Sequence, residues 1–183
     1  MAVTIRRYDA SRDRAAVRAL DRSYTTNTVY DVSRDAHSIT LVERELPTPL
    51  TRTPPIDDEL DDDKPSWDVA WVAIPASPGS SGLLGFAASS YQRWNRRMAV
   101  QHLYVDADAR RLGIASALIG HVGADASAHG AIHVWLETSN LNYPAIAAYR
   151  RMGFVLCGLD LCMFDGTESS GEVAVYMSRS LQR

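Results

Sequence analysis

Hydrophobic and polar residues alternate along several short stretches of this 183-residue chain. A period of two is typical of a strand with one buried face, because successive side chains of a strand point to opposite sides. Clusters of Gly, Pro and Ser separate some of these stretches, as turns require. The pattern predicts strands over Val3–Tyr8, Ser38–Leu46, Trp67–Ile74, Leu83–Tyr91, Met98–Val105, Ile132–Leu136, Phe154–Leu161 and Glu172–Met177.

Three other segments have the period of a helix. Apolar residues recur at every fourth position along Leu112–Ala128, which predicts a long helix. A shorter helix is predicted after Asp9, whose side-chain oxygen suits an N-cap. A third is predicted to begin at Asn142, with Pro144 in its first turn, and to end before Gly153.

Two segments lack a clean period. Asp21–Asp35 is rich in Tyr, Thr, Ser and Asn, which predicts a loop with a short helix. Pro47–Pro65 contains Pro-x-Pro and Pro-Pro steps, and the run Asp57–Asp63 places six carboxylates in seven residues. Because like charges repel each other and need hydration, we expect an acidic, Pro-rich, solvated loop at about residues 47–66 that builds no core.

The order of these elements predicts the fold class. Strands in a hairpin series come first, and a strand–helix–strand–helix–strand succession follows. This order predicts an α/β fold with a mixed central β-sheet and helices on both faces. A chain of 20.2 kDa can bury about 70% of its extended surface, so residues 1–183 are predicted to form a single domain. In such a sheet the ligand site is expected at the carboxyl end of the strand before the long helix.

Composition and charge exclude several functions. A hydrophobic fraction of 46% and a net charge of −3 argue for a globular protein that does not bind nucleic acid through phosphate contacts. The apolar runs are too short to span a bilayer, and no signal peptide is visible, so no membrane partner is expected. Cys157 and Cys162 are predicted to be reduced core residues, which favours the cytoplasm. His121 and His129 lie near no Cys or carboxylate cluster, so no metal is expected.

The segment Val105–Ser116 combines the features of an anion site. A strand ends, a short loop follows, and a helix begins with Gly113 and Ala115, where no bulky side chain blocks the backbone. Backbone N–H groups and the helix dipole favour an anion there, and Arg110 and Arg111 add positive charge. The alternative is that the glycine only begins a helix. A Walker A loop and a dinucleotide fingerprint are excluded, because their lysine and further glycines are absent.

Two motifs, in the right order, resemble those of the GNAT superfamily of N-acetyltransferases. Arg110–Ala115 matches the signature Q/R-x-x-G-x-G/A, placed between a strand and a helix as in that superfamily. Asn140–Phe154 resembles its N-x-x-A-x-x-x-Y-x-x-x-G-F segment. The chain is therefore identified as a member, which implies a GNAT fold with a splay between its two central parallel strands. Homodimers are common in the superfamily, so a homodimer is a further expectation.

The resemblance implies that acetyl-CoA is the acetyl donor. The strand that ends at Val105 would pair with the pantetheine arm, and the loop after it would hold the pyrophosphate through backbone amides. Tyr149 would donate a proton to the departing thiolate, unless it is only a core tyrosine of an amphipathic helix. The residues that the resemblance assigns to the donor are Leu103, Tyr104, Val105, Arg110, Arg111, Leu112, Gly113, Ile114, Ala115, Ser116, Asn142, Ala145 and Tyr149.

Blocks spread from about Tyr8 to Met177 further resemble the streptothricin (nourseothricin) acetyltransferases, among them Leu20–Tyr30 and Val134–Glu137. This resemblance implies that the chain acetylates the β-lysine amine of a polycationic streptothricin and so confers resistance. Two alternatives stay open. One is a GNAT enzyme for another amine, such as a polyamine, a metabolite or a protein N-terminus. The other is a non-catalytic acyl-CoA-binding module.

The acceptor amine needs a proton acceptor, because an amine with a pKa near 10.4 is neutral in only about one molecule in 2,500 at pH 7. Many members use a carboxylate on the strand that holds Leu103, but this chain has Gln101, His102 and Tyr104 there. Glu137 is therefore the first candidate base, and His102 is either a second candidate or a structural residue. The predicted substrate-binding residues are Asp21, Tyr24, Thr26, Tyr104 and Glu137.

An acidic mouth would steer a cationic acceptor toward such a site. The residues available for it are Asp21, Asp31, Asp35 and the run Asp57–Asp63, although the run also fits a loop that only keeps the protein soluble.

Overall fold

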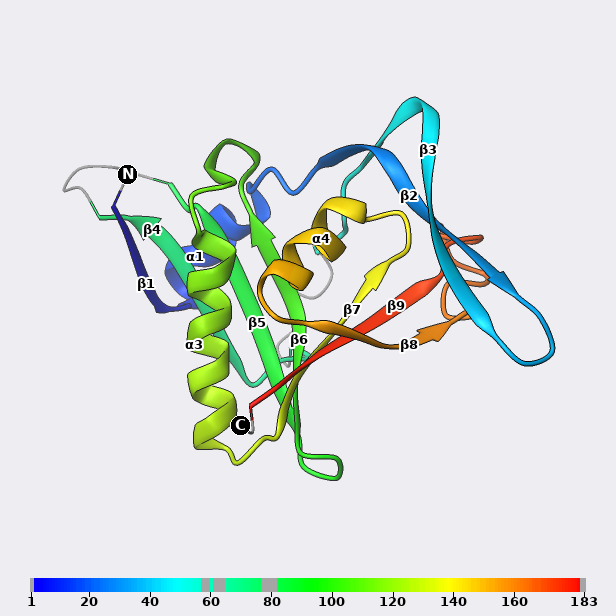
Figure 1. Cartoon of the computed structure of the whole chain (residues 1–183). Coiled ribbons are helices and arrows are strands. Elements are labelled where there is room, and N and C mark those ends of the chain that lie inside the picture. Colours follow the sequence, from blue (N-terminus) through cyan, green and yellow to red (C-terminus); the bar gives the residue numbers. More distant parts are fainter. Residues whose placement is uncertain (1, 57–59, 61–64, 77–81, 182–183) are drawn as a thin grey trace. The chain divides into compact units, whose positions relative to one another are not determined.

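The computed structural model of the chain describes residues 2–56, 60, 65–76 and 82–181 (Figure 1). Its backbone contacts group the chain into two compact units. Seven strands follow each other in one sheet in the order β1-β4-β5-β6-β7-β9-β8, and β2 pairs with β3 in a separate two-stranded sheet. The first unit comprises Met1–Ser23, Thr53–Trp135 and Ser180–Arg183, and the second comprises Tyr24–Arg52 and Leu136–Arg179.

The first unit contains antiparallel strands and the start of a parallel connection. Its strands are β1 (Val3–Arg7), β4 (Val69–Pro75), β5 (Gly85–Gln92), β6 (Arg97–Val105) and the first residues of β7 (His133–Ser139). β4 and β5 form the predicted hairpin, in which Val72 lies opposite Phe86. β6 reaches its neighbour β7 through helix α3 (Ile114–Ala128), which is the crossover that a parallel pair needs. The predicted mixed sheet of an α/β fold is confirmed.

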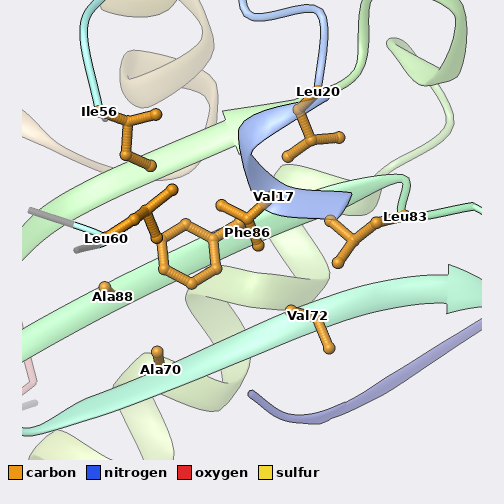
Figure 2. Packing of buried hydrophobic residues seen from close by; sticks show 9 residues of the cluster. All are labelled: Val17, Leu20, Ile56, Leu60, Ala70, Val72, Leu83, Phe86 and Ala88. Carbon is orange, nitrogen blue, oxygen red and sulfur yellow. The ribbon is translucent and has the colours of Figure 1, made fainter. Parts of the chain in front are cut away.

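Helix α1 (Ala10–Arg18) packs on one face of this sheet. Its N-cap is Asp9, as predicted, because the carboxylate accepts the Ser11 N–H at 2.9 Å. Phe86 of β5 is fully buried in the cluster beneath the helix, which Figure 2 shows from close by. The cluster consists of Val17, Leu20, Ile56, Leu60, Ala70, Val72, Leu83, Phe86 and Ala88.

Helix α3 packs on the opposite face of the same strands. Gly85 precedes Phe86 in β5 and therefore points the other way, toward α3. A Cβ at Gly85 would lie 3.0 Å from the Ile114 side chain and 2.9 Å from the Tyr104 carbonyl oxygen, so this close approach requires glycine. The prediction of helices on both faces is thus confirmed for the first unit.

The second unit is held together by the buried residue Asn140. Its strands and helix are β2 (Tyr24–Arg34), β3 (Ile39–Arg52), α4 (Tyr143–Arg151), β8 (Val155–Asp160) and β9 (Ala174–Ser180). The side-chain amide of Asn140 donates to the Tyr30 carbonyl at 2.7 Å and accepts the Val173 N–H at 2.8 Å. The amide therefore ties the residue after β7 to β2 and to the segment before β9, and both of its polar ends are satisfied.

The predictions for residues 21–52 were wrong in two places. Asp21–Asp35 was expected to be a loop, yet Tyr24–Arg34 forms β2. The loop expected from residue 47 begins later, because β3 continues through Pro47 and Pro49 to Arg52. These prolines lie where the pairing is irregular, between the partners Thr28–Glu45 and Thr26–Leu50. No ladder hydrogen bond is needed there, so the missing N–H of proline is tolerated.

Two further expectations were wrong. Cys157 and Cys162 are free and exposed instead of buried. Cys157 lies on β8, which is at the end of the sheet order, and Cys162 lies in the turn after that strand. Leu60, within the acidic run, is only 2% exposed and belongs to the core beside Ile56. The carboxylates of the run lie outside the described residues. In the described part of the chain, no helix is long and apolar enough to cross a membrane.

The burial of Leu60 predicts that its side chain is anchored in the core and stabilises the fold. Leu60→Ala is expected to lower the free energy of unfolding by about 2–4 kcal/mol, since the truncation leaves a cavity against Phe86. Leu156→Ala is the matched control, because Leu156 is 46% exposed, and a loss of less than about 1 kcal/mol is expected there. Urea unfolding measures both values. Equal losses in the two variants would contradict the anchoring.

Candidate active-site residues

Strand β6 contains a β-bulge next to the residues predicted to pair with the pantetheine arm. Ala88 of β5 lies opposite His102 and Ser89 lies opposite Val100, so Gln101 is an extra residue in this pairing. A bulge bends its strand and is often found beside active sites. The bulge therefore affects the direction of the half-buried residues Leu103–Val105, which stay paired with Gly85–Ala87 of β5.

The loop after β6 ends in left-handed backbone. Asp106 opens the turn η1 (Ala107–Ala109) by accepting the Asp108 N–H at 3.1 Å. Arg111 and Gly113 then have φ values of 63° and 79°. Only glycine adopts this conformation without steric cost, so Gly113 is required by the turn and not merely compatible with it.

Helix α3 begins without a side-chain cap. Gly113 occupies the N-cap position, and no described side chain accepts a hydrogen bond there. The N–H groups of Ile114–Ser116 have no partner within the helix, because the first turn of any helix leaves its donors unpaired. The geometry and the helix dipole together suit an anion, as the sequence predicted.

The two arginines of the loop differ in their contacts. Arg110 was predicted to add positive charge beside the anion, but its guanidinium donates to backbone carbonyl oxygens of Val105 and Ser23, at 3.2 and 2.5 Å. Arg111 is exposed, and its side chain makes no hydrogen bond or ion pair with the described residues. The Arg110 guanidinium is therefore occupied by the protein, whereas that of Arg111 is not engaged by the described residues.

The Tyr149 hydroxyl has no hydrogen-bond partner among the described residues. It lies on α4, where Asn142 caps the helix as predicted by accepting the Ala145 N–H at 3.3 Å. The Tyr149 ring packs near Phe154, with 5.9 Å between the ring centres, and its hydroxyl donates to none of the described residues. Burial raises the pKa of Tyr149 to about 12, so the phenol stays protonated near neutral pH.

Glu137 lies on β7 in an environment that favours proton uptake. Burial raises the pKa of Glu137, and the negative charge of Asp160 raises it further. Asp160 is also near Tyr176, whose hydroxyl lies 3.5 Å from the Asp160 carboxylate. A carboxylate with a raised pKa holds a proton more tightly, which is what a general base requires.

The segment that contains the loop, the uncapped helix α3 and Tyr149 matches a known protein family. The model of the acetyltransferase (GNAT) family matches residues 32–154. The chain belongs to the GNAT acetyltransferase family. It is therefore an acetyl-CoA-dependent N-acetyltransferase, as its sequence predicted.

Several relatives of this GNAT chain are similar over nearly its whole length. Streptothricin acetyltransferase of Streptomyces lavendulae is 41% identical over 168 residues, which cover 91% of this chain and 89% of that protein. The crystal structure of nourseothricin acetyltransferase has a TM-score of 0.88 at 40% identity and covers both chains completely. The fold is also shared with a putative streptothricin acetyltransferase from Bacillus anthracis str. Ames in complex with acetyl coenzyme A, with a TM-score of 0.79 at 24% identity and full coverage of both chains.

In this GNAT enzyme, His102 and Tyr104 of β6 belong to an aromatic cluster, on the strand where the sequence showed no carboxylate. His102 is buried, and its Nδ1 lies 3.2 Å from the Tyr104 hydroxyl. The His102 ring contacts Trp67 edge-on at 5.2 Å and stacks on Phe86 at 6.2 Å. These contacts are those of a core histidine.

Some of the predicted acceptor-binding residues of this GNAT enzyme form hydrogen bonds from their side chains to the backbone. The Asp21 carboxylate accepts the Ser23 N–H at 2.9 Å, and this hydrogen bonding lowers the pKa of Asp21. Thr26 is buried, and its hydroxyl donates to the Thr28 carbonyl at 2.6 Å, so it fixes the backbone of β2 where its pairing with β3 is irregular. Tyr24 is half-buried, and burial raises its pKa to about 12.

Sequence reasoning missed the environment of Glu137. Asp160 raises the pKa of Glu137, and Glu137 in turn raises the pKa of Tyr176; the strand order β7-β9-β8 that brings these residues together is not revealed by any local pattern. The alternation in β9 would have placed Tyr176 on one sheet face, but not beside Glu137. Among the described residues, no group of three or more His, Cys, Asp or Glu side chains could hold a metal ion.

Proposed function

We propose that this GNAT enzyme acetylates the β-lysine amine of a streptothricin-type antibiotic and so confers resistance. The acceptor is inferred from the relative that is 41% identical over 91% of this chain, which is a streptothricin acetyltransferase. The donor side rests on one observation of the structure, the uncapped start of α3 after the left-handed Gly113. The two free cysteines fit a reducing compartment, and we place the reaction in the cytoplasm.

The donor would be held by the loop and the strand before it. The backbone of residues 110–116 presents N–H groups to the diphosphate, and Arg111 adds charge from an exposed position. Leu103–Val105 pair with the pantetheine arm through their backbone groups. Asn142 and Ala145 set the first turn of α4, the helix that carries Tyr149.

The acetyl transfer needs two proton movements. The amine nitrogen attacks the thioester carbon, so a C–N bond forms and the C–S bond breaks. Before the attack, the ammonium form of the amine releases its extra proton to water. The attacking nitrogen then loses a second proton to Glu137, and the departing sulfur receives a proton from the Tyr149 hydroxyl. A phenol with a pKa of about 12 gives its proton to a thiolate of ordinary pKa, about 8.5, at a cost of roughly 5 kcal/mol. Burial of the thiolate raises its pKa as well, which narrows this gap.

The acceptor is tested with purified protein, acetyl-CoA and two rival amines, streptothricin F and spermidine. Release of free thiol is measured for each, and we expect the higher kcat/KM with streptothricin. A preference for spermidine would indicate another acceptor class. Binding of acetyl-CoA without transfer to either amine would instead indicate a non-catalytic acyl-CoA-binding module.

Tyr149→Phe removes the proposed proton donor and keeps the ring. We expect kcat to fall about tenfold or more, because the leaving thiolate loses its hydrogen bond. Tyr143→Phe is the matched control on the same helix, since the Tyr143 hydroxyl lies 3.4 Å from Glu43 and has no proposed catalytic role. An unchanged kcat in Tyr149→Phe, measured by thiol release, would remove the residue from the mechanism.

The raised pKa of Glu137 predicts the acid limb of the pH profile. A general base works only when deprotonated, so kcat/KM is expected to fall as the pH drops through the pKa of Glu137. Asp160→Asn removes the neighbouring negative charge that raises this pKa, and it should move the limb to lower pH. Glu137→Gln should lower kcat and abolish the limb. A limb that stays in place in Asp160→Asn argues for a different base.

A further inference from the structure

Arg110 occupies the first position of the GNAT signature, where a positive charge would be expected to bind phosphate directly. Its guanidinium is used otherwise. The Nε donates to the Val105 carbonyl oxygen at 3.2 Å, and Nη2 donates to those of Ser23 at 2.5 Å and Asp21 at 3.4 Å. All three acceptors are backbone oxygens within the first unit. Two of them belong to a segment almost ninety residues earlier in the chain.

That segment, Asp21–Ser23, is the connector between α1 and β2, and more hydrogen bonds join it to the loop. The Ala107 N–H donates to the Asp21 carbonyl at 3.1 Å. The Asp21 N–H donates in return to the carboxylate of Asp106 at 3.2 Å. Asp106 also accepts from Asp108 in the turn η1, so the same side chain shapes the loop and holds the connector. The connector and the start of the loop therefore share one hydrogen-bonded conformation.

We infer that Arg110 is a positioning residue, which fixes the shape of the cofactor loop by tying it to the connector between α1 and β2. This inference rests on the proposed function, in which the loop binds acetyl-CoA. The planar fork of arginine can reach several carbonyl oxygens at once, whereas a lysine ammonium is a single point charge. Arg111 is exposed and carries the charge that a diphosphate meets.

The tie has a consequence for the acceptor side. The connector contains Asp21 and leads directly into Tyr24, both predicted to contact the acceptor. The planar guanidinium of Arg110 is hydrogen-bonded both to the end of β6 and to the connector. A change in the conformation of the loop therefore also changes the conformation of the connector. Arg110 therefore acts on binding through geometry and not through its charge.

The experiment measures the Kd of acetyl-CoA by calorimetry at two salt concentrations, with the full chain. The variants are Arg110→Lys and Arg110→Gln, with Arg111→Lys and Arg111→Gln as matched controls. If Arg110 positions the loop, both Arg110 variants weaken binding by a similar factor, about tenfold or more, although one of them keeps the charge. The Arg111 pair is expected to differ, with only the glutamine variant weakened and less sensitive to salt.

Three results would overturn the inference. In one, Arg110→Lys binds as the unchanged protein does while Arg110→Gln loses affinity, which makes Arg110 a phosphate ligand. In another, both variants bind normally while folded, as circular dichroism would show, which leaves a purely structural role. In the third, the unchanged protein does not bind acetyl-CoA, which would refute the proposed function itself. This failure is distinguished from a failure of the Arg110 inference because it is seen without any variant.

Asp106→Ala removes the other side chain that joins the loop to the connector. This variant replaces an Arg110 variant that fails to fold. Removal of a negative charge beside the loop would strengthen the binding of an anion if electrostatics governed the affinity. Positioning predicts the opposite sign, because the variant frees the connector and the turn η1 together. A Kd raised about threefold or more supports the inference, and a lowered or unchanged Kd overturns it.

Discussion

The unpaired N–H groups at the start of α3 are the constraint on which the proposed chemistry depends. Helices α1 and α4 are capped at this end, since Asp9 caps α1 and Asn142 caps α4 with side-chain oxygens. Gly113 supplies no such oxygen, and its φ of 79° turns the chain directly into the helix. Buried or half-buried donors demand an acceptor, so this end of α3 is completed by water or by an anionic ligand. The acetyl donor of a GNAT enzyme carries a diphosphate, which satisfies several donors at once.

Backbone groups elsewhere are satisfied by side chains from distant parts of the sequence. Arg110 does this in the first unit, where it bonds three carbonyl oxygens, and Asn140 does it in the second, where its amide joins Tyr30 to Val173. Arg110 follows β6 and the turn η1, and Asn140 follows β7 directly. Beyond the end of a strand the ladder no longer pairs backbone groups, so side chains satisfy them instead.

The sequence was sufficient where the signal is local. Alternation predicted the strands of the first unit, and the cap residues Asp9 and Asn142 predicted the starts of α1 and α4. It failed where tertiary pairing decides. β2 has no clean period because only part of it is covered, and Leu60 is buried despite its acidic neighbours because the Phe86 cluster accepts it. The role of Arg110 was not predictable, since its partners lie 87 and 89 residues away.

One physical cause, the loss of water around buried groups, acts on both proposed proton-transfer residues. Burial raises the pKa of Glu137 and of Tyr149, because in each case the charged form is the one that loses hydration. For a carboxylate this makes proton uptake from an amine easier, and for a phenol it keeps the proton in place until a sulfur anion develops nearby. The fold can thus supply a better base and a retained donor without a metal or a second charged partner for Tyr149. The two residues differ in one respect: the negative charge of Asp160 raises the pKa of Glu137 further, whereas the pKa of Tyr149 is raised by burial alone.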